Sequence, residues 1–213
     1  MNKNLIVIPA RGGSKGIPLK NIYPIKGIPL INYTIESIDN SYFYDNYDIV
    51  VSSDSDIIFS KIDKKYTNIK MLKRPKKYST DISSTEQVLM SVINSMKRDY
   101  NRQYEHVVTL QPTSPLRKTK TIIKFIEFFK NNPKYDAQLT LSEHYGDFWS
   151  RDQSGNFYRI HKNAPRRRQD RNPLYLENSA IYITSINSLI YTNSILGEIT
   201  NGYIIDELEV VDI

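Results

Sequence analysis

The chain has 213 residues, no cysteine, three histidines and a formal net charge of +6. Without cysteine it can form neither a disulfide framework nor a thiolate metal site, and a reducing compartment suits it. Because 23 acidic residues are interspersed among 29 basic ones, the charge favours a small anion such as a nucleotide as much as a nucleic acid. No apolar run is long enough for a signal peptide or a membrane span, so we expect a soluble cytoplasmic protein.

The most informative stretch is a glycine-rich loop after a short apolar run. Residues 5–8 form an unbroken run rich in β-branched side chains, typical of a strand buried on both faces. The loop contains three glycines and three cations: Gly12, Gly13, Gly16, Arg11, Lys15 and Lys20. We expect the glycines to adopt positive φ and to bring backbone N–H groups close to a ligand, which suits a phosphate chain. A flexible surface turn is the alternative, since neither G-x-x-x-x-G-K-[ST] nor G-x-G-x-x-G matches.

Apolar runs and helical spacing alternate along the rest of the chain. Strands are predicted at 48–53, 68–72, 105–110, 136–141, 178–183 and 202–205, and helices at 30–38, 54–65, 85–96, 119–130 and 185–191. Such alternation implies a Rossmann-like α/β fold with a mostly parallel central sheet and helices on both faces. We assign 1–142 and 178–213 to this domain. The aromatic, aperiodic stretch 143–177 is assigned to a small insert, with a hairpin after the Ser154-Gly155 turn.

A polar, basic segment at residues 73–85 cannot belong to the core. Ser83 or Ser84 can cap the following helix, with Glu86 or Gln87 closing a capping box. A capped helix N-terminus also attracts anions, so the same segment can serve a nucleotide.

Two further segments stand out. Two prolines fix a rigid turn within residues 111–117, at the carboxyl end of a predicted strand, where ligands bind in open α/β sheets. Arg117 is expected to cap this turn or to pair locally. Residues 166–171 carry four arginines, which alone indicate a solvated surface or a nucleic-acid patch.

Five motifs in order resemble the CMP-sialic acid synthetase (N-acylneuraminate cytidylyltransferase) family, which includes CMP-legionaminic acid synthetases. They are I-P-A-R-G-G-S-K-G-I-P at 8–18 with K-N at 20–21, R-P at 74–75 with D-I-S-S-T at 81–85, L-Q-P-T-S-P-L-R at 110–117, R-Q at 168–169 before N-S-A-I-Y-I at 178–183, and V-D-I at 211–213. Ser179 stands where the family usually has glycine. The resemblance implies CMP transfer from CTP to an acidic nine-carbon sugar for surface polysaccharide biosynthesis, in a homodimer formed through the insert.

The resemblance assigns roles residue by residue. Nucleotide binding falls to Ala10, Arg11, Gly12, Gly13, Ser14, Lys15, Lys20, Asn21, Arg74, Asp81, Ser84 and Thr85, and sugar binding to Gln111, Arg168 and, as second choice, Arg167. The expected catalytic residues are Arg11, Lys20 and Asp212. Asp212 is expected to bind Mg²⁺ or Mn²⁺ on the triphosphate, as the first carboxylate of a D-x-D pair whose second member would fall one residue past Ile213. No histidine lies in these motifs, so the general base stays open between a metal-bound hydroxide and Asp212.

The acidic sugar stays open. A sialic-type acid is expected first, with legionaminic, pseudaminic and 3-deoxy-octulosonic acids as alternatives; the last is disfavoured because the loop of those enzymes resembles A-R-x-x-S-T-R-L-P. The lysine that the family places near the sugar from the partner subunit has no match around 145–151. A CTP-binding protein without turnover and a nucleic-acid binder are the competing classes, and the latter predicts a steep salt dependence.

Overall fold

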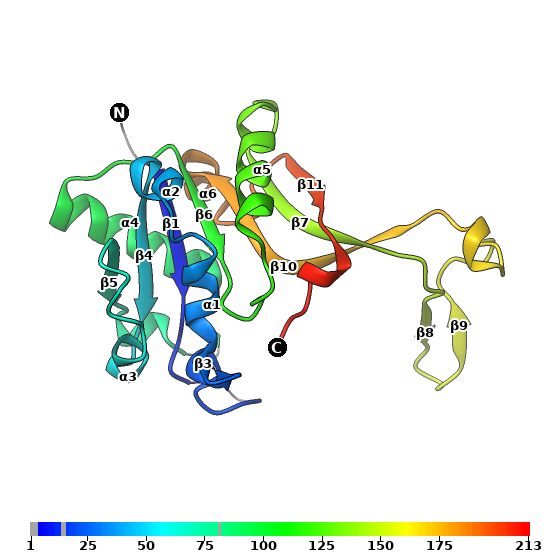
Figure 1. Cartoon of the computed structure of the whole chain (residues 1–213). Coiled ribbons are helices and arrows are strands. Elements are labelled where there is room, and N and C mark those ends of the chain that lie inside the picture. Colours follow the sequence, from blue (N-terminus) through cyan, green and yellow to red (C-terminus); the bar gives the residue numbers. More distant parts are fainter. Residues whose placement is uncertain (1–3, 14–15, 81) are drawn as a thin grey trace.

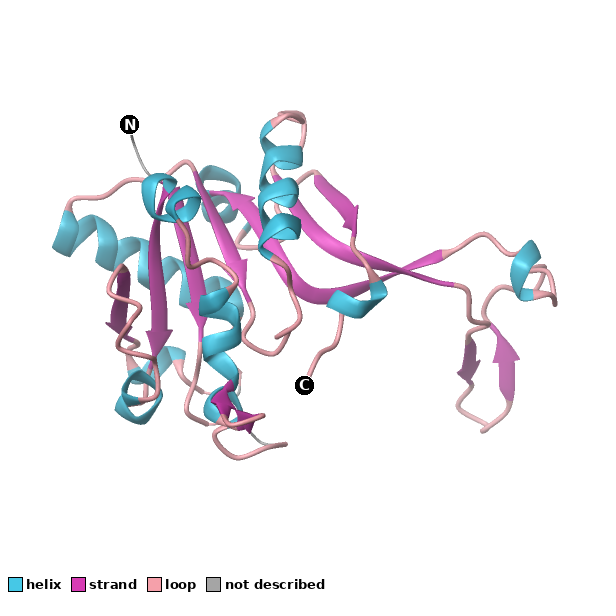
Figure 2. Ribbon diagram, in the orientation of Figure 1, coloured by secondary structure: helices cyan, strands magenta, loops and turns pink. Residues whose placement is uncertain are grey.

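The computed structural model describes residues 4–13, 16–80 and 82–213, which form a seven-stranded sheet with helices on both faces (Figures 1 and 2). In spatial order its strands are β11 (Thr200–Ile204), β7 (Ala137–His144), β10 (Leu174–Ser185), β6 (His106–Leu110), β1 (Asn4–Pro9), β4 (Tyr47–Ser53) and β5 (Ile69–Lys73). The helices are α1 (Leu30–Glu36), α2 (Ser41–Asn46), α3 (Asp56–Ser60), α4 (Thr85–Tyr100), α5 (Thr119–Lys130) and α6 (Ile186–Thr192). Two ribbons pair β2 (Pro24–Ile25) with β3 (Ile28–Pro29) and β8 (Trp149–Arg151) with β9 (Phe157–Arg159), and short 3-10 helices cover Lys20–Ile22, Lys76–Tyr78, Arg168–Asp170 and Glu207–Glu209.

The strand directions confirm a mostly parallel sheet. β1 runs parallel to β4 and β6, β4 to β5, and β7 to β11. β10 is the exception, because it runs antiparallel to both β6 and β7. The described residues between β7 and β10 contain no α-helix, and a connection without a helical crossover lets the chain return in the opposite direction.

Successive side chains of β1 are buried on opposite faces of the sheet. Ile6 and Ile8 join a core beneath α1, α2, α3 and α5, while Leu5 and Val7 join a second core beneath α4 and α6. All four side chains are fully buried. None of the described helices is long and apolar enough to cross a membrane. The unbroken apolar run thus follows from helices on both faces, and the predicted Rossmann-like arrangement is confirmed.

Some local elements differ from the predicted ones. The helix expected over 54–65 covers only α3, and Ser55 precedes it without a side-chain cap bond. After α3, Asp63 Oδ1 accepts the Lys65 N–H at 3.1 Å, a local turn that competes with helical bonding. α2 and the β2–β3 ribbon were not predicted, because each is too short to display a period.

β10 contains a bulge where it passes β7. The pairing register shifts between Glu177 and Tyr182, so the residues between them face only Thr140. Thr140 Oγ1 donates to Asn178 Oδ1 at 2.6 Å and so holds the bulge from the facing strand. Within it Ser179 has a φ of 56°, a conformation that glycine adopts without strain, which gives a physical reason for glycine at this motif position.

Arg117 corrects one expectation from the sequence. It neither caps its own turn nor pairs locally: its buried guanidinium donates to Thr34 Oγ1 at 2.7 Å and to the backbone carbonyl of Ala180 in the bulge. These partners lie 83 and 63 residues away in the sequence. A local pattern could not reveal them, because α1 and the β10 bulge meet this turn only in the folded chain.

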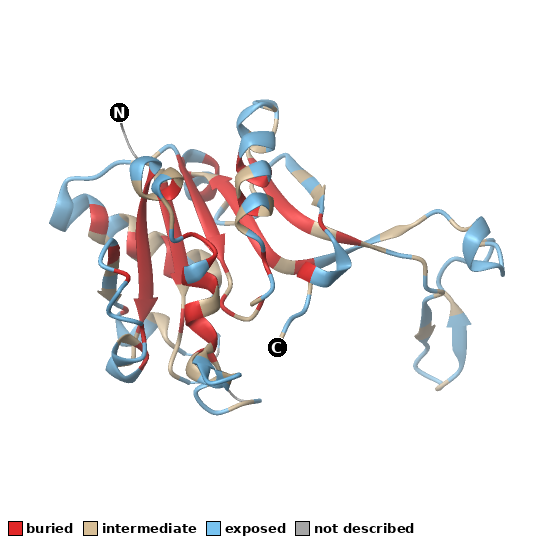
Figure 3. Cartoon of the chain, viewed as in Figure 1, coloured by how far each residue is buried: buried red, intermediate tan, exposed pale blue. Residues whose placement is uncertain are grey.

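Between β7 and β10 the chain leaves the sheet as an arm, residues 145–173 (Figures 1 and 3). The β8–β9 ribbon confirms the hairpin predicted after the Ser154-Gly155 turn. Most of the arm is exposed, including large apolar side chains at Phe148, Trp149, Phe157, Tyr158 and Ile160. The assignment of 143–177 as a dimerisation insert stays a prediction.

His106 gives the fold a sensitivity to acid. Its ring is buried with centroids 6.1 Å from Tyr47 and 5.9 Å from Phe129, and Nε2 has no hydrogen-bond partner among the described residues. Burial, and secondly the Lys130 charge, lower the pKa of His106 from 6.5 to about 4. Between these values the unfolded chain holds a proton that the folded chain lacks, so the free energy of unfolding falls as the pH falls.

We expect the wild-type chain to lose about 2 kcal/mol of unfolding free energy through His106 between pH 7 and pH 5. His106→Phe should abolish this component, because phenylalanine cannot bind the proton. Urea denaturation at the two pH values measures the difference. The exposed His161→Phe control should keep the wild-type pH dependence, and an unchanged dependence in His106→Phe would contradict the prediction.

Candidate active site

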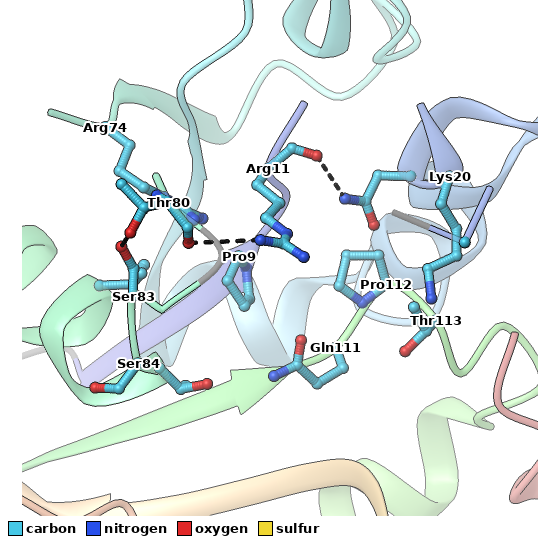
Figure 4. A pocket seen from close by; sticks show the side chains of 14 residues that line it. Pro9, Arg11, Lys20, Arg74, Thr80, Ser83, Ser84, Gln111, Pro112 and Thr113 are labelled. Atoms are coloured by element: carbon cyan, nitrogen blue, oxygen red, sulfur yellow. Dashed lines mark hydrogen bonds between the residues drawn. The ribbon is translucent and has the colours of Figure 1, made fainter. Parts of the chain in front are cut away.

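A pocket of about 410 Å³ opens at the carboxyl edge of the sheet, beyond the ends of β1, β5 and β6 (Figure 4). It is lined by Pro9, Arg11, Gly16, Lys20, Asn21, Arg74, Thr80, Ser83, Ser84, Thr85, Val88, Gln111, Pro112 and Thr113. Parallel strands end at one edge, so segments far apart in the sequence meet there. Open α/β sheets bind ligands at this edge.

Arg74 is the buried cation of the pocket. It follows β5, and its Nη2 donates to the backbone carbonyl of Ser52 at 2.8 Å while Nε donates to Ser52 Oγ at 3.3 Å. Burial lowers the pKa of Arg74 to about 10; the Asp54 charge opposes this shift and the Arg11 charge adds to it. At neutral pH Arg74 therefore stays charged beside a second cation, an arrangement that favours an anionic ligand.

Asp54 fixes the glycine-rich loop, a role that the sequence did not reveal. Its Oδ1 accepts the Gly12 N–H at 2.8 Å. A Cβ at Gly12 would lie 2.8 Å from Ser55 Cβ, so glycine is needed for this close approach. Neither Gly12 nor Gly13 has the positive φ that we expected. Close packing against the segment after β4, rather than an unusual backbone conformation, requires the glycine.

Arg11 and Lys20, the other two cations among the described lining residues, belong to the segment after β1. Asn21 is buried and donates through Nδ2 to the backbone carbonyl of Arg11 at 2.9 Å, while Arg11 Nη1 lies 3.5 Å from the Thr80 carbonyl oxygen. In the view of Figure 4 the Arg11 guanidinium lies between the Arg74 and Lys20 side chains. The pocket thus collects positive charge from two separate segments of the chain.

Helix α4 presents its N-terminus to the pocket. Ser84 Oγ accepts the Gln87 N–H at 3.3 Å and the Gln87 side chain accepts the Ser84 N–H at 3.2 Å, so the predicted capping box is confirmed. The partial positive charge of a helix N-terminus adds to that of the cations. Thr80 and Ser83, which we did not predict to bind nucleotide, also line the pocket, with their hydroxyl oxygens 2.8 Å apart. The density of hydroxyl side chains in 79–85 was the signal that could have identified them.

Gln111 lies in the same pocket, whereas Asp212 belongs to a segment that is bonded to the pocket wall. Gln111 follows β6 and lines the pocket. Asp212 does not line it, but the next residue, Ile213, donates its N–H to the Thr113 carbonyl at 3.1 Å. Lys20 Nζ in turn donates to Ile213 O at 2.5 Å. The segment that carries Asp212 is therefore bonded to two residues of the pocket wall.

The metal role predicted for Asp212 requires a site in which the nucleotide phosphates and water supply most of the ligands. The described residues hold no group of three or more histidine, aspartate or glutamate side chains that could bind a metal. Burial and the hydrogen bond to Glu177 raise the pKa of Tyr182, and the charge of the exposed Asp212 adds to the rise, so this carboxylate lies within electrostatic range of Tyr182 in β10. Mg²⁺ at triphosphate sites typically takes one or two carboxylates plus phosphates and water. Asp212 fits a metal that arrives on a nucleotide.

Half of the residues predicted to bind nucleotide line the pocket. They are Arg11, Lys20, Asn21, Arg74, Ser84 and Thr85. Ala10, Gly12 and Gly13 do not line it, and Ala10 is buried in the core. The remaining three lie outside the described residues: Ser14, Lys15 and Asp81.

The arginines predicted to bind the sugar lie apart from Gln111 within one chain. Arg168 lines a second pocket at the base of the arm, together with Glu143, His144, Tyr145, Gly146, Arg171 and Glu207. Its guanidinium carbon lies 5.8 Å from the centre of the Tyr145 ring. Arg167 is exposed, 3.9 Å from Asp170. A single chain therefore does not bring Gln111 together with Arg168.

The fold and the pocket define an α/β protein that builds a cationic ligand site at the carboxyl edge of its sheet. The profile of the cytidylyltransferase family matches residues 5–203. The chain belongs to this family.

Three relatives differ in the sugar for which they are named. N-acylneuraminate cytidylyltransferase of Streptococcus agalactiae serotype III (strain NEM316) is 32% identical over 205 residues, 94% of this chain and 48% of that protein. Pseudaminic acid cytidylyltransferase of Campylobacter jejuni is 39% identical over 144 residues, 67% of this chain and 60% of that protein. CMP-N,N'-diacetyllegionaminic acid synthase of Legionella pneumophila is 32% identical over 220 residues, 98% of this chain and 90% of that protein. The chain thus spans about half the length of the first relative.

A solved structure agrees with the fold. CMP:2-keto-3-deoxy-manno-octonic acid synthetase complexed with CTP matches 96% of this chain and 91% of its own, with a TM-score of 0.64 and 17% identity. At this identity the likeness concerns the fold alone.

We expect Gly12→Ala to lower the free energy of unfolding by about 1–3 kcal/mol, because the added Cβ meets Ser55. Gly13→Ala is the matched control: nothing lies within 4 Å of a Cβ there, so it should be neutral or stabilising by up to about 1 kcal/mol. Urea denaturation of both variants measures the difference. Equal stabilities would show that the loop does not need the close approach.

Proposed function

We propose that this chain is a cytidylyltransferase that transfers CMP from CTP to a nonulosonic acid and releases pyrophosphate. The observation that carries the proposal is the pocket at the carboxyl edge, where Arg11, Lys20 and Arg74 meet the N-terminus of α4 and the side chain of Gln111. Membership of the cytidylyltransferase family supports CTP as the nucleotide. A cytoplasmic location is part of the proposal because CTP is the donor.

In this reaction the anomeric hydroxyl oxygen of the sugar attacks the α-phosphorus of CTP. The new oxygen–phosphorus bond forms, the bond from the α-phosphorus to the bridging oxygen of pyrophosphate breaks and pyrophosphate leaves with that electron pair, and the hydroxyl proton passes to a base, for which Asp212 is the candidate among the chain's residues. Negative charge gathers on the phosphates, so cations held in place before the reaction lower the barrier. We assign Arg11 and Lys20 to this charge, Arg74 with the α4 N-terminus to the bound nucleotide, and Gln111 to alignment of the sugar.

A divalent cation, Mg²⁺ or Mn²⁺, is part of the proposal, with Asp212 as its protein ligand. Such an ion would supply charge neutralisation on the triphosphate. The chain's own contribution is to hold the Asp212 segment against Thr113 and Lys20.

The proposed acceptor is a sialic-type acid, with legionaminic and pseudaminic acids as alternatives. The relatives are named for N-acylneuraminate, pseudaminic acid and N,N'-diacetyllegionaminic acid, so the comparisons favour this sugar class without choosing within it. A sugar carboxylate needs a cation, and a planar guanidinium such as that of Arg168 can bind it through two hydrogen bonds.

We propose that the complete sugar site combines two copies of the chain. Gln111 and Arg168 line separate pockets of one chain. The arm that carries Arg168 also exposes large apolar side chains, with Trp149 53% and Phe157 69% exposed. An exposed apolar cluster of this kind favours a protein partner, and a second copy would both cover it and bring Arg168 to Gln111.

The first test is pyrophosphate release from CTP and Mg²⁺ with N-acetylneuraminic, legionaminic, pseudaminic and 3-deoxy-octulosonic acids in parallel. We expect release with one nonulosonic acid, and a loss of kcat/KM of about 10²–10³-fold in Lys20→Met because a phosphate cation is removed. Lys26→Met, an exposed lysine that does not line the pocket, should match wild type. CTP binding without release for any sugar would favour a non-catalytic CTP-binding protein instead.

The second test mixes two variants. Gln111→Leu and Arg168→Met should each be nearly inactive, and refolding them together should restore at most about a quarter of wild-type activity, because half of the dimers would be mixed and each would hold one intact site. Pyrophosphate release by the mixture measures the recovery. No recovery from a mixture that forms dimers would mean that each chain builds its sugar site alone.

A further inference from the structure

Glu209 is a buried carboxylate that is bonded to the start of α5, the helix that follows the Gln111 turn. It lies in the short 3-10 helix Glu207–Glu209 and is only 3% exposed. Its Oε2 accepts the Lys118 N–H at 2.9 Å, and its Oε1 accepts the Thr121 hydroxyl at 3.0 Å. Lys118 Nζ approaches Oε1 at 3.3 Å. A buried carboxylate is tolerated only with such compensation, so these contacts tie Glu209 to one place.

These contacts make Glu209 an N-terminal cap of helix α5. The residue before α5 is Lys118, whose own side chain makes no cap bond. Helix N-termini leave backbone N–H groups without partners and favour negative charge. Glu209 accepts one of these N–H groups and places its charge at the helix N-terminus. The segment that contains Glu209 is therefore fastened to the start of α5.

The same segment is fastened at two further points. Before Glu209, Ile205 donates its N–H to the Leu141 carbonyl of β7 at 3.0 Å and is buried. After it, Ile213 donates its N–H to the Thr113 carbonyl at 3.1 Å. We name residues 205–213 the tail segment. Glu209 and Ile213 therefore bond to the turn between β6 and α5 at two places, and Asp212 lies between these two residues in the sequence.

We propose that Glu209 is a positioning residue that holds Asp212 at the nucleotide pocket for a divalent cation carried by CTP. This inference rests on the proposed function. Glu209 itself lies too deep in its contacts with α5 to reach a ligand, so it acts through the tail segment. Without these bonds the tail segment would keep the hydrogen bonds of Ile205 and Ile213 and the packing of Val210 against the core, and the backbone that carries Asp212 would be held less tightly.

The experiment compares Glu209→Gln with Glu127→Gln, an identical chemical change at an exposed position of α5. Glutamine keeps the shape but replaces one acceptor oxygen by a donor group and removes the charge. Hydrogen–deuterium exchange of the amides of residues 210–213 should become about tenfold faster in Glu209→Gln. Mn²⁺ affinity in the presence of CTP, followed by electron paramagnetic resonance, should fall about tenfold, the size found when groups that support a metal ligand are removed. CTP affinity in EDTA should match wild type, and Glu127→Gln should match it throughout.

A purely structural role for Glu209 makes a different prediction. It would lower the melting temperature but leave Mn²⁺ affinity unchanged, and that result would overturn the proposal. An equal loss of CTP affinity in EDTA would also overturn it, because the whole pocket would then be damaged. If Glu209→Gln does not fold, Thr121→Val is the second variant. It removes the hydrogen bond from the Thr121 hydroxyl to Glu209, and the same changes in amide exchange and Mn²⁺ affinity are expected.

A failure of the proposed activity can be distinguished from a failure of the positioning role of Glu209. A wild-type chain that binds Mn²⁺ with CTP but releases no pyrophosphate with any sugar would sink the activity and leave the positioning role standing. A wild-type chain that binds no Mn²⁺ with CTP would overturn the positioning role.

Discussion

A buried guanidinium joins the turn that carries Gln111 to α1 and to β10. Arg117 is 4% exposed, and no carboxylate pairs with it among the described residues. It is held instead by dipoles, the Thr34 hydroxyl of α1 and the Ala180 carbonyl in the β10 bulge. Burial lowers the pKa of Arg117 to about 9, which is the expected sign for a cation removed from water without an opposite charge. The bulge and the turn therefore need each other, since separating them would leave the charge without compensation.

The sequence predicted the features that local chemistry encodes. The apolar run of β1, the capping box of Ser84 and Gln87, and the position of Gln111 after a strand each follow from neighbouring residues, and the structure confirms them. The direction of β10 and its bulge could not be predicted, because a strand pattern has the same period in either direction. Partners such as Asp54 for Gly12 were missed for a related reason, since they meet only after the sheet has assembled.

Motifs also cannot say which copy of a chain completes a site. The segments with Gln111 and Arg168 both fit one family pattern, yet in the folded chain they line different pockets. The arm that separates them leaves the sheet between β7 and β10 (Figure 1). A family resemblance therefore predicts the role of a residue better than it predicts which copy of the chain supplies that residue. The exposed aromatic side chains of the arm favour a second copy as the source of the contact between Gln111 and Arg168.

The turn between β6 and α5 is where these constraints converge. One end of it is held by the buried Arg117, the adjacent Lys118 N–H is accepted by Glu209, and the Thr113 carbonyl accepts the Ile213 N–H. Gln111, at the other end, thus sits on a segment bound to α1, to β10 and to residues 205–213. Alignment of reacting groups is sensitive to displacements of about 1 Å. In the proposed reaction the protein aligns phosphates and sugar and forms no covalent bond to either, so rigidity at this turn would favour it, which gives a physical reason for the buried charges around the turn.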